Sequence, residues 1–99
     1  FSHVVIFWTD PEQPNAAKDL MDGAHKYLKD IPGADHFHVG YMATSERPVV
    51  DQSYQVALNI VFKDKATQDA YQIHPDHVKF VEEVFKKVVT KVVVYDFGG

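Results

Sequence analysis

The chain has 99 residues, which is enough for one domain with a modest hydrophobic core and too few for two. We therefore expect residues 1–99 to form a single domain. Apolar residues make up 45% of the chain and charged residues 24%, which is typical of a globular domain and argues against a disordered one. The absence of cysteine excludes disulfides, thiolate metal sites and a cysteine nucleophile.

Charge and hydropathy narrow the range of partners. The net charge is −4, and the sequence has no basic patch of the kind that binds nucleic acid. No apolar run approaches the roughly 20 residues of a membrane span, and no leader-like segment is visible. We expect a cytoplasmic protein, with which the lack of cysteine is compatible, and neither nucleic acid nor membrane as a partner.

The first half of the chain predicts a strand, a helix and a second strand. His3–Trp8 is rich in β-branched and aromatic residues, as is typical of a strand with two apolar faces. Apolar residues recur at intervals of three and four over Ala16–Ile31, which predicts a helix that stops before a Pro-Gly pair. Alternation over Ala34–Met42 predicts the second strand.

The second half repeats elements of the same kinds. Ser53–Lys63 alternates throughout and is the clearest strand of the chain. Asp64 is a good N-cap for a short helix that runs to Tyr71. A proline then interrupts this helix and suits the first turn of the next one, predicted over Pro75–Val89 from its apolar stripe. Lys91–Phe97 closes the chain as a fourth strand.

The order βαββαβ predicts an α+β fold, the ferredoxin-like plait, with a four-stranded antiparallel sheet and both helices on one face. The helices shield only that face, yet the other face also carries apolar side chains, among them Val4, Ile6, Trp8 and Val61. A bare face of this kind would be an unusually large exposed apolar patch. A second copy packed sheet against sheet would cover it, so we predict a homodimer.

The segment from Tyr71 to His77 carries the most pointed combination of chemical groups. Pro75 starts a helix, so His77 lies in the first turn, at the head of the stripe that faces the sheet. The positive end of the helix dipole opposes protonation of an imidazole there, so His77 should stay neutral near pH 7, as a general base does. Tyr71 lies about one turn upstream and can share a hydrogen bond at the same cavity. We predict His77 and Tyr71 as the catalytic pair.

Other roles fit the same kinds of residue. His74 can bond the backbone as a cap while His77 packs in the core. Their spacing also permits two metal ligands, but no third ligand stands at a recognisable distance in the sequence, so no metal is expected. His36 and His38 share the strand face that should meet the partner subunit, where they could bind a metal across the dimer, tune association with pH, or form a polar patch. The sequence leaves these last three roles open.

Aromatic side chains, including those of Tyr41 and Tyr54, are expected to gather between the sheet and the helices. A gap among them would form an apolar pocket with Tyr71 and His77 at its mouth, suited to a small, largely apolar carbonyl compound. A phosphate loop, a nucleophile elbow and a dinucleotide fingerprint are missing, so no cofactor is expected. The expected ligand contacts are His3, Phe7, Phe37, Val56, Leu58 and Phe80.

Several segments together resemble one known family. The sequence contains HVVIFW at its start, SYQVALNIVF in its third strand, AYQIHPDHVKFVE across the two later helices, and VVVYDF near its end. It resembles in these segments the Dabb family, the stress-responsive dimeric α/β-barrel domains, over essentially the whole chain. The resemblance implies a ferredoxin-like fold and a homodimer whose two sheets form a barrel.

One plant branch of that family, the olivetolic acid cyclases, closes a linear polyketide by aldol condensation. The resemblance places the acid/base pair of that branch on His77 and Tyr71, and its opening histidine on His3. This chain departs from the branch at Val56, where the branch has a histidine, and at Ala24 and Val88, where it has bulkier aromatic residues. The shape and polarity of the pocket should therefore differ, and the cyclase substrate is not expected here.

Three functions are compatible with the sequence, which leaves open whether the domain is an enzyme. In the first, His77 removes a proton alpha to a carbonyl and Tyr71 hydrogen-bonds the enolate oxygen, in cyclase-like or lyase-like chemistry. In the second, the protein is a non-catalytic, stress-associated or binding dimer in which His77 is structural. In the third, it is a cofactor-free monooxygenase or isomerase of the dimeric plait type.

Overall fold

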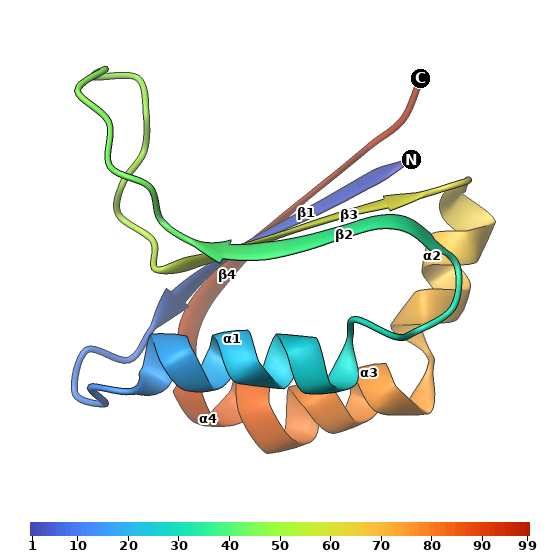
Figure 1. The fold of residues 1–99 in the computed structure, drawn as a ribbon, viewed down its shortest axis with the longest axis horizontal. Helices are drawn as coiled ribbons and strands as arrows, with labels where there is room; N and C mark the ends of the chain where they lie inside the picture. Colours follow the sequence, from blue (N-terminus) through green and yellow to red (C-terminus); the bar gives the residue numbers. More distant parts are fainter.

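The computed structural model describes residues 1–99 and contains the predicted four-stranded antiparallel sheet with helices on one face (Figure 1). The strand order is β2-β3-β1-β4, so the first strand of the chain lies inside the sheet, between β3 and β4. The strands are β1 (Ser2–Thr9), β2 (Ala34–Tyr41), β3 (Val56–Phe62) and β4 (Val89–Phe97). The helices are α1 (Ala16–Tyr27), α2 (Lys65–Gln72), α3 (Pro75–Phe80), the π-helical turn η1 (Val81–Phe85) and α4 (Lys86–Val88).

The helical layer covers one face of the sheet. Figure 1 shows α1 and the continuous α3–η1–α4 segment side by side beneath the sheet, with α2 at one end. Alternate residues of the two central strands point into this layer, because successive side chains of a strand face opposite sides. They form most of the buried core together with Leu20, Ala24 and Leu28 of the α1 region: Val5, Phe7, Val56, Leu58, Ile60 and Phe62.

Local capping explains where α2 and α3 begin. The Asp64 carboxylate accepts a hydrogen bond from the backbone N–H of Thr67 at 2.9 Å, which satisfies one of the free donors at the start of α2. At α3 the ring nitrogen Nδ1 of His74 accepts from the backbone N–H of Asp76 at 3.0 Å. Pro75 follows as the first helical residue, where its missing N–H costs nothing. The sequence prediction for both starts is confirmed.

The end of α1 differs from the prediction. The helix ends at Tyr27 rather than at Ile31, and residues 28–30 form turns. Pro32 lacks a backbone N–H and so could not have extended the helix. Leu28 and Ile31 nevertheless remain buried, so the apolar stripe was identified correctly. Gly33 then takes a φ of 104°, a conformation that glycine adopts readily.

The helix predicted over Pro75–Val89 starts at Pro75 and ends one residue early, at Val88, and it contains a π-helical turn, η1, which was not predicted. This turn lies against Gly23 of α1, where a Cβ atom would fall 2.7 Å from both γ-carbons of Val84. Glycine at this position therefore allows the two helices to approach closely. Wide turns of this kind often occur near functional sites, and the residues of η1 that face the sheet border the cavity described below.

The opposite face of the sheet carries no helix. Val4, Ile6 and Trp8 are only partly buried there, and Tyr95 and Phe97 of the edge strand β4 are 58% and 59% exposed. The chain between β2 and β3 extends away from the body of the molecule (Figure 1).

The predicted position of two aromatic residues, between the sheet and the helices, is wrong. Tyr54 packs against Trp8, with ring centroids 6.5 Å apart, and Tyr41 is 55% exposed.

None of the helices combines the length and apolar character that crossing a membrane requires.

Candidate functional site

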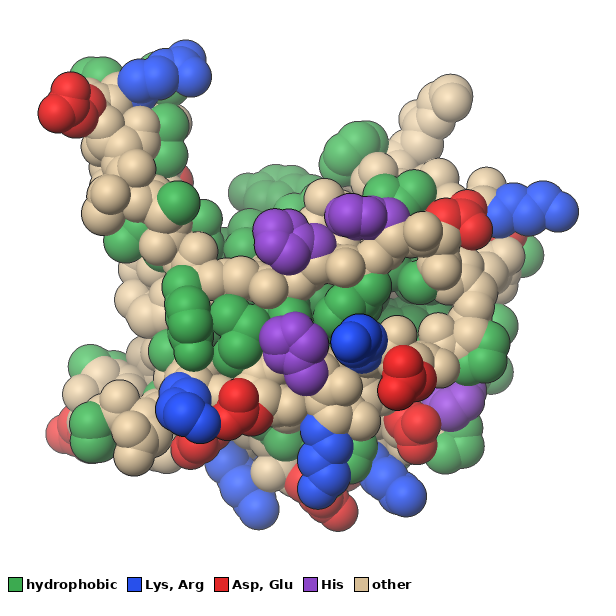
Figure 2. Space-filling model, in the orientation of Figure 1, with side chains coloured by type: hydrophobic (Ala, Val, Ile, Leu, Met, Phe, Trp, Pro, Cys, Tyr) green, Lys and Arg blue, Asp and Glu red, His purple; other side chains and the backbone are tan.

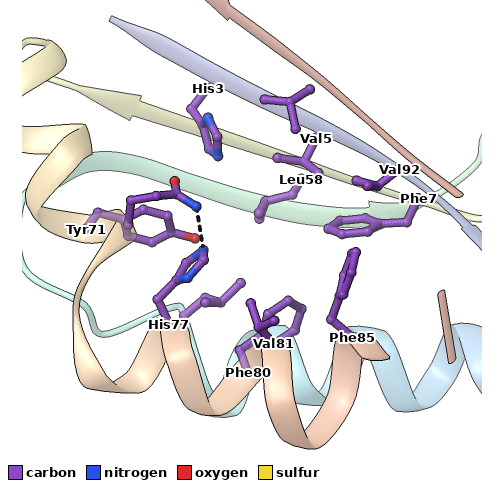
Figure 3. Close-up of a pocket in the computed structure, with 13 residues that line it drawn as sticks. His3, Val5, Phe7, Leu58, Tyr71, His77, Phe80, Val81, Phe85 and Val92 are labelled. Carbon is purple, nitrogen blue, oxygen red and sulfur yellow. Dashed lines mark hydrogen bonds between the residues drawn. The ribbon is translucent and has the colours of Figure 1, made fainter. Parts of the chain in front are cut away.

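A cavity of about 180 Å³ lies between the sheet and the α3–η1 segment (Figure 3). An engineered cavity of roughly 150 Å³ is large enough to bind benzene, so this space accepts a ligand head of about one aromatic ring. Its mouth lies at the sheet edge, where the partly exposed Val92 and Val94 of β4 border it. Its apolar walls include Val5, Phe7, Leu58, Phe80, Val81 and Phe85.

Tyr71 projects its phenol into this cavity from the last turn of α2 (Figure 3). The side chain is only 2% exposed, and its ring packs 5.2 Å from that of Phe62. Burial raises the pKa of the Tyr71 phenol above its usual range, because a charged phenolate would lose its hydration. Tyr71 is therefore a neutral hydrogen-bond donor, and no protein group accepts from its hydroxyl.

His77 lies beside Tyr71 in the first turn of α3, with the two ring centroids 5.0 Å apart in an edge-to-face arrangement. Burial lowers the pKa of His77, and the charge that His3 carries when protonated lowers it further. The imidazole therefore favours its neutral form, as the sequence predicted. The largest cause is loss of hydration, whereas the prediction relied on the helix dipole.

A chain of two glutamine amides ends on His77. Gln68, which is buried, donates from Nε2 to Oε1 of Gln72 at 2.6 Å. The Nε2 atoms of Gln72 and His77 lie 3.1 Å apart, joined by the dashed line in Figure 3. Because an amide nitrogen only donates, His77 accepts at Nε2 and carries its hydrogen on Nδ1. The amides thus select the tautomer of His77 whose basic atom is Nε2.

The first histidine of the chain, His3, approaches the same space from β1. Its Nδ1 lies 2.5 Å from the Oδ1 atom of Asp96 on β4. His3 and Asp96 are directly opposite each other in the pairing of β1 with β4. His3 is 5% exposed, whereas the side chain of Asp96 is 42% exposed. A buried imidazole is thereby linked to a carboxylate that reaches solvent.

The structure brings together six of the eight residues predicted for the site. His3, Phe7, Leu58, Tyr71, His77 and Phe80 all line the cavity. Two others do not reach it: Phe37 packs against His25 of α1, with ring centroids 6.4 Å apart, and Val56 lies in the fully buried core. The alternation of side chains along the strands correctly predicted the face on which Phe37 and Val56 lie. Alternation does not predict how far along that face the cavity extends.

Sequence reasoning missed two polar residues of the site. Gln72 directly follows Tyr71 in the sequence and lies five residues before His77. The break between α2 and α3 falls between Gln72 and His77, so helical spacing could not predict their contact. Asp96 is the only charged residue of the last strand after Lys91. A single carboxylate in an otherwise apolar run was the signal from which a role for Asp96 could have been predicted. Its pairing with His3 depends on the register of β1 and β4.

The polar groups of the cavity are all neutral or histidine side chains. No lysine or arginine borders it, so an anionic ligand would find no fixed counter-charge inside. No cluster of three or more histidine, aspartate or glutamate side chains is arranged to hold a metal ion. Other histidines gather along β2 and on α1, away from the cavity lining (Figure 2). The arrangement suits a neutral ligand with a hydrogen-bond acceptor next to an apolar group.

Comparison with known proteins agrees with this architecture. The family model of the stress responsive A/B barrel domain, Dabb, matches residues 1–98. The chain belongs to the Dabb family, as the resemblance of its sequence segments indicated. No curated protein sequence matches the chain.

Solved structures share the same fold over nearly the whole chain. A Dabb family protein with a ferredoxin-like fold from Mesorhizobium loti is 28% identical, with a TM-score of 0.79 over 99% of this chain and 94% of its own. A dimeric ferredoxin-like protein of unknown function from Thermobifida fusca is 18% identical, with a TM-score of 0.77 over 99% and 89%. A hydroxynitrile lyase from Passiflora edulis is 16% identical, with a TM-score of 0.73 over 97% and 89%. The ferredoxin-like α+β fold is thereby confirmed.

Proposed function

We propose that this protein binds a small, neutral carbonyl compound in the cavity between sheet and helices and transfers a proton at the carbon next to the carbonyl. The observation that carries the proposal is the pairing of Tyr71 and His77 in an apolar cavity of about 180 Å³. One group is a neutral donor whose hydroxyl has no protein partner, and the other is a neutral imidazole. These are the two functions that enolisation requires.

In this reaction the Nε2 atom of His77 takes a proton from the α-carbon of the ligand. The electron pair of the broken C–H bond forms a carbon–carbon double bond, and the carbonyl oxygen takes the negative charge. The Tyr71 hydroxyl donates a hydrogen bond to that oxygen, where charge develops in a site with little water. In the structure without ligand, the Gln72 amide donates to Nε2 of His77 and so selects the tautomer in which Nε2 is the basic atom. The ligand takes the place of this amide when it approaches Nε2.

We also propose that the protein acts as a homodimer that buries the helix-free face of the sheet. This face carries apolar side chains on β1, β3 and β4, including Ile6, Val61 and Val93, with the polar Asn59 between Ala57 and Val61 on β3. The similar protein from Thermobifida fusca is described as dimeric. A cytoplasmic location for this dimer remains a prediction from the sequence.

Deuterium exchange tests the proposed reaction. Acetophenone, a one-ring ketone with exchangeable methyl protons, is incubated with the protein in deuterated buffer, and the loss of its methyl signal is followed by proton NMR. We expect the wild type to accelerate exchange and His77→Ala to return it to the buffer rate, since acid–base groups contribute about 10²–10⁴ in rate. Tyr71→Phe should show an intermediate rate.

The matched control is His25→Ala, which removes an exposed histidine of α1 that bonds the backbone oxygen of Met21. It should exchange at the wild-type rate. The proposal is wrong if His77→Ala folds as the wild type does, judged by circular dichroism, and still accelerates exchange fully.

A second candidate is a binding protein without catalysis, and the Gln72–His77 hydrogen bond favours it because the imidazole already has a protein partner. In that case His77 holds α2 and α3 together across the helix break. His77→Ala would then lower the melting temperature while the wild type bound acetophenone without exchanging its protons. Melting curves and exchange rates of the same variant separate the two functions.

A further inference from the structure

A second imidazole faces the cavity from the sheet, across from His77. His3 on β1 points into the cavity (Figure 3), and its ring centroid lies 6.1 Å from that of Tyr71. The Tyr71 ring in turn lies 5.0 Å from that of His77. One phenol is therefore flanked by two imidazoles, one carried by a strand and one by a helix. A single ligand beside Tyr71 can contact both rings.

The orientation of His3 is fixed by Asp96. A carboxylate only accepts hydrogen bonds, so the 2.5 Å contact places a hydrogen on Nδ1 of His3. The other ring nitrogen, Nε2, has no hydrogen-bond partner in the protein. Every fully buried side-chain nitrogen does have such a partner. Nε2 is therefore not fully buried and is accessible from the cavity. The Asp96 side chain is 42% exposed at the other end of this contact. Protons can therefore pass between the His3–Asp96 pair and water.

The two imidazoles differ in their surroundings. An imidazolium at His3 has the Asp96 carboxylate as a counter-charge within ion-pair distance. The neighbours of the His77 ring are the Gln72 amide and the Tyr71 phenol, neither of which is charged. Charge on His3 also opposes charge on His77. A carboxylate counter-charge therefore faces the His3 ring, and no charged side chain bonds to the His77 ring.

We propose that His3, positioned by Asp96, is the general acid of the cavity and works opposite His77. This inference rests on the proposed function and narrows its substrate class to neutral carbonyl compounds whose carbonyl oxygen receives a proton as the α-carbon loses one. Asp96 is a positioning residue, because it acts through His3 and does not itself line the cavity.

The proposed step is balanced between the two rings. His77 Nε2 takes the α-proton, the C–H electron pair forms the carbon–carbon double bond, and the π-electrons of the carbonyl move to oxygen. The oxygen takes the proton from Nε2 of His3, and Tyr71 hydrogen-bonds the same oxygen. The neutral ketone becomes a neutral enol, His77 becomes charged and His3 becomes neutral. Water resets both rings, at His3 with the help of the exposed Asp96 carboxylate.

The test uses the acetophenone exchange assay with Asp96→Asn, His3→Gln and the double variant. Asp96→Asn keeps the shape of the side chain and removes its charge, and we expect it to slow exchange about tenfold or more, as loss of an acid–base group does. His3→Gln should slow exchange at least as much. In the double variant, Asp96→Asn should have no further effect, because Asp96 acts only through His3. A merely structural carboxylate would not show this dependence.

Asp35→Asn is the matched control, since it removes an exposed carboxylate of β2 and changes the net charge equally. It should exchange at the wild-type rate. Nitrogen-15 NMR of the histidine rings adds a readout without substrate: the hydrogen on Nδ1 of His3 should be seen in the wild type and lost or redistributed in Asp96→Asn. If His3→Gln does not fold, Asp96→Asn carries the test by itself.

The outcomes separate this inference from the proposed function. Wild-type exchange in a folded Asp96→Asn variant, together with no exchange in His77→Ala, overturns the role of His3 and leaves the proposed function intact. Full exchange in a folded His77→Ala variant overturns both. Slow exchange in Asp96→Asn and in His77→Ala, with the expected absence of additivity in the double variant, supports both.

Discussion

Both faces of the sheet carry apolar side chains, but their surroundings differ. On the covered face, Val56, Leu58 and Ile60 are at most 2% exposed beneath the helices. On the opposite face the side chains that alternate with them, such as Ala57 and Val61, remain partly exposed. The open face also carries polar residues, Asn59 on β3 and His36 and His38 on β2. The difference arises because the chain supplies only one helical layer.

This comparison explains why one face contains the site and the other the proposed interface. A cavity needs walls on both sides, and only the covered face has a second layer from which Tyr71 and His77 can project. The open face is a flat apolar surface of the kind that association buries. The four predictions that follow test this division, beginning with the largest effect.

A charge on the covered face should abolish folding. Val56→Asp places a carboxylate in the fully buried core, outside the cavity and without a partner. We expect a loss of about 5 kcal/mol or more, which is most of the stability of a small domain. Circular dichroism should show no cooperative melting. A cooperative transition near the wild-type temperature would show that this face is less tightly packed than the structure indicates.

The same charge on the open face should separate the dimer into monomers without unfolding them. Ile6 lies opposite Ala57 and Val93 in the middle of that face, so Ile6→Asp should weaken dimerisation about thirtyfold or more, as loss of a central interface residue does. Sedimentation velocity over a range of concentrations measures this. Ile73→Asp, at an apolar residue that is 79% exposed away from the sheet, should dimerise normally. A monomeric wild type at high concentration would refute the proposed interface.

The helical layer depends on the close approach of α1 to η1. Gly23→Ala adds a Cβ atom 2.7 Å from the γ-carbons of Val84, and relief of this overlap should cost about 1–3 kcal/mol in the free energy of unfolding. Urea denaturation measures the change. Gly23→Ala combined with Val84→Ala should recover part of the loss, whereas two independent losses that simply add would contradict the steric explanation.

The smallest effect concerns acid stability. Because the folded state lowers the pKa of His77 below its ordinary value of 6.5, the unfolded chain takes up this proton first as the pH falls. Stability present above about pH 6.5 is therefore lost as the pH falls towards the lowered pKa. His77→Gln should reduce the difference between melting temperatures at pH 7.5 and pH 5.5. His25→Gln should leave that difference unchanged, and an equal reduction in both variants would argue against a specific role of His77.

Much of the architecture could be predicted from the sequence because it depends on local patterns. The alternation of Ser53–Lys63 and the apolar stripe of Pro75–Val89 correspond to β3 and to the α3–η1–α4 segment. The helix start at Pro75 also placed His77 correctly, since a first-turn residue on the apolar side of α3 must face the sheet. These elements agree with the family match over residues 1–98.

Features that depend on distant contacts could not be predicted in the same way. The His3–Asp96 pair requires the register of β1 against β4, and the close contact of Gly23 with Val84 of η1 requires the packing of two helices. Tyr54 lies before β3 begins, so its expected alternation no longer applied and it packs on Trp8. Phe37 and Val56 lie on the expected face, but the extent of the cavity depends on how the helices sit above it.

The position of the cavity mouth has a consequence for ligand length. Val92 and Val94 border the cavity on the edge strand β4, so the opening lies at the margin of the sheet and not beneath it. A molecule that inserts its carbonyl end can leave a tail outside without displacing any helix. The interior volume therefore restricts the size of the inserted group only. Homologous ketones with progressively longer tails should enter equally well, while branching next to the carbonyl should exclude them.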